Sequence, residues 1–396
     1  MKHINEIENV LTPETKPTST LTPIEIPSNL KPTTFKEGFG WQRLGIGLIT
    51  PILSLVLGFS VVGVVLALTG NNPFFVYGEM YGSAFGDGNA FADTLVQAIP
   101  LILTGLAVVV AFSVRLWNIG AEGQFFAGAI AATGTALLFD KSLGSLAIPL
   151  MMLAGMAGGA IWALIPALLR AFLNVNEIIS TLMLNYVITL FAEYLIYGPW
   201  RDPQGFNFPL TRTFDEAVWL PTFGTTNVHL GLVFGIVAAI VVGVLLARTV
   251  WGYELKVMGD SLTAARYAGI NVIRNILLAM LLSGALAGLA GMGQVAGIDH
   301  KLQQGVSPGY GFTAIIIAWL ARLNVIGVII VAILFGGLVN SGYAMKTIGI
   351  SSGFVTLVQG AILFFVLAGE AISRRLYYHQ DLKKILSSAV VGRVPE

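Results

Sequence analysis

The residues best suited to bind a polar solute lie in one short segment, Asn118 to Gln124, which reads NIGAEGQ. It combines the carboxylate of Glu122 with the amides of Asn118 and Gln124, and it leads directly into an apolar run. Ionisable groups at membrane depth usually face a protein interior or a water-filled path, because a charge in lipid is costly. The segment therefore indicates a broken helix lining a solute path. The alternative is an interfacial helix start, at which the macrodipole stabilises Glu122.

Three further side chains could contribute to such a path. Asn185 lies in the run NEIISTLMLNY, Gln294 lies late in a later apolar run, and Trp319 lies in a short one. Amides within apolar helices often bond to a neighbouring helix, so a structural role is the alternative for both amides. Trp319 could offer a stacking face or simply pack. The complete predicted path is Asn118, Glu122, Gln124, Asn185, Gln294 and Trp319.

The composition indicates the class of protein that holds these residues. Of 396 residues, 55% are hydrophobic and 11% are charged, whereas soluble domains have about 25% charged residues. The apolar runs continue for about 20 residues, the length of a membrane-spanning helix, so an all-α polytopic membrane protein is expected rather than a barrel. There is no cysteine and the four histidines are scattered, so no metal site is expected. No basic cluster suggests nucleic-acid binding.

Ten apolar segments are predicted to span the membrane, namely 44–68, 94–112, 119–138, 147–169, 178–198, 229–247, 276–297, 311–321, 325–345 and 354–372. With the polar loop 249–275 placed inside, 17 of the 22 Lys and Arg residues fall on the cytoplasmic side. That bias supports ten spans with both termini cytoplasmic. Ten spans divide into five and five, which is compatible with an inverted repeat. The short segment 311–321 would then correspond in position to 119–138.

Three regions follow from this topology. Residues 1–42 are rich in Pro and Thr and are predicted to form a disordered cytoplasmic tail. Residues 43–373 form the transmembrane domain, with a cytoplasmic loop at 249–275 and an external loop at 198–228, and 374–396 form a second cytoplasmic tail. Glycines four residues apart predict close helix packing in three places, at Gly155 and Gly159, Gly284 and Gly288, and Gly293 and Gly297.

The cytoplasmic loop contains a short predicted helix. Asp260 or Ser261 can cap a helix over Leu262 to Ala268, and Gly269 can supply a left-handed stop. Two helical turns are marginal alone, because nucleation is costly. The helix therefore needs a partner to pack against.

Three motifs occur in an order that resembles the nucleoside-type ABC permeases, a group related to ribose and branched-chain amino-acid permeases. They are NIGAEGQFFAGA (118–129), NEIISTLMLNY (176–186) and GDSLTAARYAGIN (259–271). The resemblance implies that the loop helix couples to an ATPase. Its coupling residues would be Asp260, Ser261, Ala264, Ala265, Arg266 and Gly269.

The resemblance also implies the partners and location of the chain. It would be a multi-pass protein of the bacterial cytoplasmic (inner) membrane, working with ABC ATPase subunits, a second and non-identical permease, and an external substrate-binding lipoprotein. No lysine follows a glycine, so the chain has no Walker A sequence of its own. ATP and magnesium would bind the partner ATPase, and this chain would be a transporter subunit rather than an enzyme, with no bound cofactor.

The predicted function is the translocation path of an importer for a small polar solute, with nucleosides as the first expectation. The alternatives are a simple sugar or another small polar solute in the same kind of transporter. An ion-coupled secondary transporter would also account for ten spans and Glu122.

Overall fold

A computed structural model describes residues 41–351 and 353–369, with side chains from Ile52 onward except that of Lys141. The predicted tails fall outside these residues, apart from Trp41 and Gln42 at the start of the first helix. The described residues from Leu48 onward belong to one compact unit, whose architecture is given below.

The described part of the chain is helical, without named strands. In chain order its elements are α1 (Trp41–Leu68), α2 (Pro73–Phe85), α3 (Gly88–Phe112), α4 (Ala121–Leu143), η1 (Gly144–Leu146), α5 (Ala147–Leu173), α6 (Glu177–Tyr197), η2 (Glu216–Val218), α7 (Gly231–Arg248), α8 (Val250–Asp260), α9 (Leu262–Tyr267), α10 (Val272–Gln294), η3 (Val295–Asp299), α11 (Tyr310–Leu320), α12 (Val325–Thr347) and a last helix at Gly353–Gly369. Each of the ten predicted apolar segments lies in one of these helices to within about two residues, except that 276–297 continues from α10 into η3 and that 354–372 extends beyond the described residues. The prediction of an all-α fold is confirmed.

Six helical stretches are long and apolar enough to cross a membrane, namely Gly88–Phe112, Gly144–Leu173, Glu177–Tyr197, Gly231–Arg248, Val272–Asp299 and Val325–Thr347. The chain is therefore a polytopic membrane protein. The helix α11 has only 11 residues, as the short segment 311–321 predicted. At 1.5 Å per residue it spans about half of a bilayer core.

Two helices were not predicted, because neither forms a long apolar run. The helix α2 begins with Asn72, whose side chain accepts hydrogen bonds from the next turn, and Pro73 occupies its first position. It packs against α12 and α3, which compensates for its glycines. The helix α8 is amphipathic and buries only Gly252, Leu255 and Met258. Such a helix is stabilised by packing of one face rather than by overall hydrophobicity.

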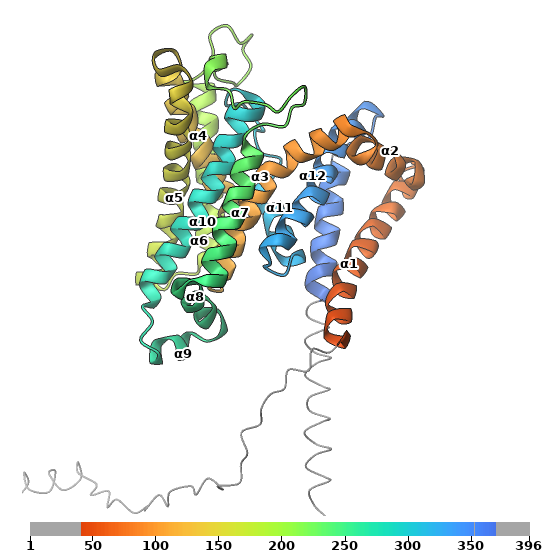
Figure 1. Cartoon of the computed structure of the whole chain (residues 1–396). Helices are drawn as coiled ribbons and strands as arrows, with labels where there is room; N and C mark the ends of the chain where they lie inside the picture. Colours follow the sequence, from red (N-terminus) through yellow and green to blue (C-terminus); the bar gives the residue numbers. More distant parts are fainter. Residues whose placement is uncertain (1–40, 352, 370–396) are drawn as a thin grey trace, which may run out of the picture. The chain divides into compact units, whose positions relative to one another are not determined.

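The helix α3 lies at the centre of the bundle and packs against α7, α10, α11 and α12. Next to it, α4, α5 and α10 pack on one another. In Figure 1 the loop that follows α6 lies at one end of this bundle, and α8 and α9 lie at the opposite end. The long helices thus connect two polar regions.

Two of the three predicted glycine pairs lie where helices cross. A Cβ atom at Gly288 would lie 2.1 Å from the carbonyl oxygen of Gly155, and one at Gly159 would lie 2.1 Å from that of Gly284. The backbones of α5 and α10 therefore touch. The third pair is different, because a Cβ at Gly293 would meet nothing within 4 Å. The prediction of a packing role is wrong for Gly293.

Candidate functional site

The polar loop predicted at 249–275 folds into two consecutive helices. Ser261 is the N-cap of α9, and its Oγ accepts a hydrogen bond from the amide of Ala264 at 3.2 Å. Gly269 has φ of +74°, as a left-handed stop requires. The predicted helix is therefore present, ends at Tyr267 rather than Ala268, and is capped by Ser261 rather than Asp260.

Hydrogen bonds join α8 to the start of α10. The carboxylate of Glu254 accepts bonds from Asn275 Nδ2 at 2.7 Å and Arg274 Nη2 at 2.8 Å. Asn275 in turn accepts a bond from Trp251 Nε1 at 3.1 Å. The bond from Asn275, and then that from Arg274, lower the pKa of Glu254. These contacts fix both ends of the loop, and α9 is carried between them.

The surface of α9 is almost entirely exposed. Tyr267 is 90% exposed and Leu262 is 43% exposed. Among the predicted coupling residues, Asp260, Ser261, Ala264, Arg266 and Gly269 are exposed as well. Ala265 is fully buried, so it holds α9 in place and offers no surface to a partner.

The start of α4 meets the start of α11 inside the bundle. The carboxylate of Glu122 accepts a hydrogen bond of 2.6 Å from the amide of Gly311. A Cβ at Gly311 would lie 2.1 Å from the amide nitrogen of Glu122, so only glycine permits this approach. The start of α4 and the start of α11, 189 positions apart in the sequence, are thus in contact. A carboxylate at a helix N-terminus is favoured by the unsatisfied amides there.

The side chains of Asn118 and Gln124 are buried and hydrogen-bonded to each other. Their amides exchange two hydrogen bonds, of 2.9 and 3.0 Å. Asn118 Nδ2 also donates to Ser283 Oγ at 2.9 Å, and Ser283 donates to the carbonyl of Ala107 at 2.7 Å. The chain of bonds ties α4 to α10 and α3. Ser283 was not predicted, since a lone serine in an apolar helix gives no sequence signal.

Asn185 connects α6 to the segment before α4. Its Oδ1 accepts a bond from the amide of Gly123 and its Nδ2 donates to the carbonyl of Ile119, both at 2.9 Å. Beside it lies a cavity of about 450 Å³ that Glu122 also lines. Its other polar lining side chains are Tyr186, Thr189, Glu193, Gln303, Gln304 and Ser307. The cavity thus combines two carboxylates with several amides and hydroxyls.

The two remaining predicted path residues lie elsewhere. Gln294 donates to Asp299 Oδ2 at 3.0 Å, and Asp299 also accepts a bond from Gln303 of the cavity. Gln294 Oε1 is buried and has no hydrogen-bond partner within residues 41–351 and 353–369. Trp319 packs against Trp117, with ring centroids 5.7 Å apart, and lines a different cavity.

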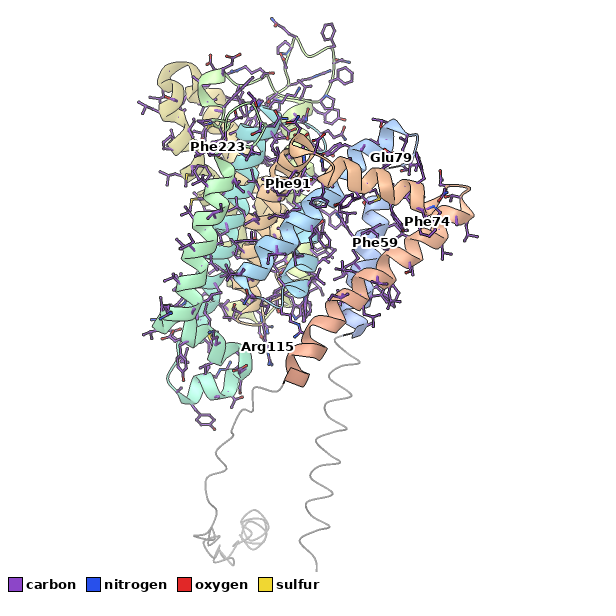
Figure 2. All side chains as sticks on the ribbon, turned by 45° about the vertical axis from the view of Figure 1, so that its right-hand side comes forward. Phe59, Phe74, Glu79, Phe91, Arg115 and Phe223 are labelled. Carbon is purple, nitrogen blue, oxygen red and sulfur yellow. The ribbon has the colours of Figure 1, made fainter. Side chains whose placement is uncertain are left out.

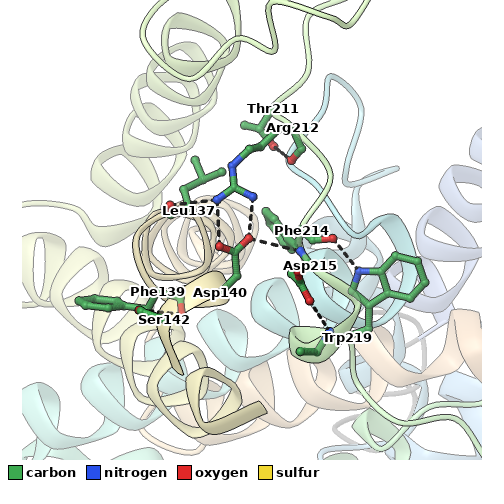
Figure 3. A network of polar contacts seen from close by, with 10 residues as sticks. Leu137, Phe139, Asp140, Ser142, Thr211, Arg212, Phe214, Asp215 and Trp219 are labelled. Atoms are coloured by element: carbon green, nitrogen blue, oxygen red, sulfur yellow. Dashed lines mark hydrogen bonds and ion pairs between the residues drawn. The ribbon is translucent and has the colours of Figure 1, made fainter. Parts of the chain in front are cut away.

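The loop between α6 and α7 is attached to the C-terminal end of α4 by a part-buried ion pair, shown in Figure 3. Arg212 Nη1 and Nη2 donate to the two carboxylate oxygens of Asp140 at 2.6 and 3.0 Å, and Nη2 also donates to the carbonyl of Leu137. These bonds raise the pKa of Arg212. The loop is therefore ordered, although Phe206 within it is 91% exposed.

His229 lies buried just before α7. Its Nδ1 accepts a bond from the amide of Gly231 at 3.1 Å, and its Nε2 has no hydrogen-bond partner in the part of the chain that the structure describes. Burial, and then the nearby His300, lower its pKa to about 4 from 6.5.

We expect this histidine to destabilise the fold in acid. Below pH 6.5 the unfolded chain takes up a proton on His229 that the folded chain does not accept until about pH 4. Stability should therefore decrease as the pH falls through this window, by about 3 kcal/mol. Thermal unfolding of the purified chain against pH measures the effect, and His229→Gln should flatten the curve. Parallel curves for the two proteins would contradict it.

Comparison with known proteins bears on this arrangement of polar loop and cavity. A family model described as the permease component of the branched-chain amino acid transport system matches residues 90–367. The chain belongs to this permease family. A glucose ABC transporter permease of Haloferax volcanii is 36% identical, over 82% of this chain and 88% of the relative.

Two further relatives are each 32% identical. One is a nucleoside ABC transporter permease of Lactococcus lactis, matched over 80% of this chain and 90% of its own length. The other is a guanosine ABC transporter permease of Bacillus subtilis, matched over 82% and 94%. No solved structure shows a significant match.

Family membership establishes several of the expectations. This ABC permease is a multi-pass protein of the inner membrane and is not an enzyme, because ATP is hydrolysed on a separate subunit. Permeases of this kind bind no cofactor themselves, and they function with an ATPase and a second permease. The ion-coupled alternative is therefore not retained.

Proposed function

We propose that this ABC permease forms, with a second and non-identical permease, the path by which an importer moves nucleosides. The observation that carries the proposal is the cavity at Glu122 and Asn185, which Phe312 also lines. Carboxylates and amides can bond to ribose hydroxyls and base edges, and an aromatic ring can stack on a base. The substrates named for two relatives, a nucleoside and guanosine, agree with that chemistry.

The cavity suits a polar but uncharged solute. A solute that enters an apolar bundle loses its water, and each unpaired polar group then costs about 1 to 3 kcal/mol. The lining side chains replace those bonds. Glu122 and Glu193 contribute two carboxylates to a lining that holds no Lys or Arg, which disfavours anions such as nucleotides.

The other predicted path residues do not line this cavity. Asn118 and Gln124 form the wall behind Glu122, because their amides are already paired. Gln294 is linked to the cavity by hydrogen bonds, because Asp299 accepts one bond from Gln294 and another from Gln303, which lines the cavity. Trp319 is not included, since it lines another cavity.

A simple sugar is the second candidate substrate. The glucose permease of Haloferax volcanii is 36% identical to this chain, and sugar hydroxyls would bind the same carboxylates and amides. A sugar has no planar base, however, so it would gain less from Phe312, which is 43% exposed.

Uptake of labelled guanosine by cells that express the chain with its partner subunits tests the proposal. Glu122→Gln and Glu193→Gln should each lower uptake at least about tenfold, because each removes a charged acceptor. Phe312→Ala should weaken competition by guanosine more than by glucose. Glu79→Gln is the matched control, since Glu79 is exposed on α2 (Figure 2) and does not line the cavity. Wild-type uptake in both cavity variants would overturn the path, and uptake of glucose alone would overturn the substrate.

We also propose a partner for each of the two polar ends of the bundle. In it α9 docks on the partner ATPase, which holds ATP and magnesium, and the external loop faces a substrate-binding lipoprotein. The chain crosses the membrane ten times with both termini in the cytoplasm, and its halves form an inverted repeat. Contact between Glu122 on α4 and Gly311 on α11 supports the repeat.

Cysteine labelling should report this orientation, because the chain has no native cysteine. Phe206→Cys and Tyr267→Cys place thiols at sites that are 91% and 90% exposed at opposite ends of the bundle. An impermeant thiol reagent added to intact cells should label the first and spare the second until the membrane is opened. The reverse pattern would invert the topology.

A further inference from the structure

A second and larger cavity lies at the end of the bundle that carries α8. Its volume is about 1360 Å³, and it is bordered by α7, α12 and the ends of α3, α8 and α11. Its lining includes three basic residues, Arg115, Lys256 and Arg322, and a single acid, Asp260. Figure 2 shows Arg115 at this end of the bundle. The cavity is therefore basic, in contrast to the acidic cavity at Glu122.

None of the three basic side chains is neutralised within the described part of the chain. The ion pairs there involve Arg170, Arg212 and Arg274, each with a carboxylate. Arg115, Lys256 and Arg322 are exposed, and their side chains make no hydrogen bond or ion pair with other described residues. Three positive charges thus converge on one cavity without a partner among the described residues.

Two of these residues occupy backbone positions that normally favour glycine. Arg115 has φ of +54° and Arg322 has φ of +53°. Each follows a helix and takes part in the same closing pattern, in which the next amide bonds to a carbonyl five residues back, Leu116 to Ala111 and Leu323 to Ala318. Gly269 fills the equivalent position after α9. A left-handed conformation is disfavoured for a residue with a Cβ, so arginine is not there for the turn.

The remaining walls are apolar and lie along two spans. Ile240 and Val244 of α7 are 61% and 53% exposed, and Ile326 of α12 is 69% exposed. Trp117 and Trp319 also line the cavity, and aromatic side chains are common at membrane interfaces. The cavity thus combines basic, aromatic and aliphatic walls.

The geometry points to a binding site for one anionic phospholipid, such as phosphatidylglycerol. The phosphate would lie among Arg115, Lys256 and Arg322, and an acyl chain would lie between α7 and α12. Basic pockets between transmembrane helices are suited to anionic head groups. A free phosphate would satisfy the charges but would leave the aliphatic walls uncovered. The site is separate from the proposed nucleoside path and does not depend on the substrate.

Native mass spectrometry of the full-length chain, purified with its partner subunits, tests the site. We expect retained phosphatidylglycerol to exceed added phosphatidylcholine, and each lost charge to lower its affinity about fivefold. Arg115→Gly and Arg322→Gly remove the charges at positions where glycine is the preferred residue, so folding should be preserved. Lys256→Gln, on the exposed side of α8, provides a third variant. Arg248→Gln is the matched control, because Arg248 is exposed at the same end but does not line the cavity.

Each result then has a definite meaning. Loss of phosphatidylglycerol in the three cavity variants and not in Arg248→Gln supports the site. Equal binding of the two lipids, or an equal loss in the control, would overturn it. Displacement of the lipid by millimolar inorganic phosphate would show a simple anion site and would also overturn it. Absence of lipid from the assembled complex would indicate that the partner ATPase covers the cavity, which again contradicts the proposal.

Discussion

Gly288→Ala should prevent stable packing of α5 against α10. The added Cβ would lie 2.1 Å from the carbonyl oxygen of Gly155, and a helix backbone cannot move aside as a flexible side chain can. Overpacking of a core usually costs about 1 to 3 kcal/mol, and a clash with backbone should reach at least about 3 kcal/mol. Thermal unfolding of the purified protein and the yield of monodisperse protein measure the loss.

The same substitution at Gly293 is the control. Gly293 lies on the same helix, but its Cβ would meet nothing within 4 Å. Alanine there should be neutral or stabilise the helix by up to about 1 kcal/mol, because alanine has the higher helix propensity. Equal stability of the two alanine variants would show that α5 and α10 do not cross as closely as described.

Leu262→Asp together with Tyr267→Asp should abolish ATP-driven uptake while the chain stays folded. Both side chains are exposed on α9, so little packing within the permease is lost. If α9 docks on the ATPase, a charge on each apolar contact should cost about 2 to 4 kcal/mol of binding, as at other interface hot spots. Uptake should then fall about 100-fold, and the ATPase should no longer co-purify.

Tyr253→Asp separates α9 from the rest of the loop. Tyr253 is 67% exposed on α8, so it offers the same change of charge in the same loop. It should leave co-purification of the ATPase intact. Retained uptake in the α9 variant, or an equal loss in Tyr253→Asp, would rule out α9 as the docking element.

Local features of the chain were predictable from the sequence. Ser261 and Gly269 mark the start and end of α9, because capping and left-handed stops depend on residues a few positions apart. The long apolar helices followed from run length alone. The helices α2 and α8 were missed because their stability comes from one packed face.

Individual contacts between distant segments were not predictable from the sequence. The sequence singled out the start of α4 and the short segment 311–321 as the two unusual segments, but not the bond between Glu122 and Gly311 that joins them. The bond of Asn118 to Ser283 spans 165 positions, and the pairing of Asp140 with Arg212 spans 72. Many other polar side chains of the chain could have formed these hydrogen bonds. Which of them come within bonding distance depends on how the helices pack, and the sequence alone does not show it.

The ion pair between Asp140 and Arg212 allows α4 to transmit movement from one end of the bundle toward the other. One end of this 23-residue helix is bound to the loop between α6 and α7, and the other end carries Glu122 against Gly311. At 1.5 Å per residue α4 is about 34 Å long, and a helix is stiff along its axis. Any displacement of Arg212 along that axis must therefore reach the carboxylate that borders the inner cavity.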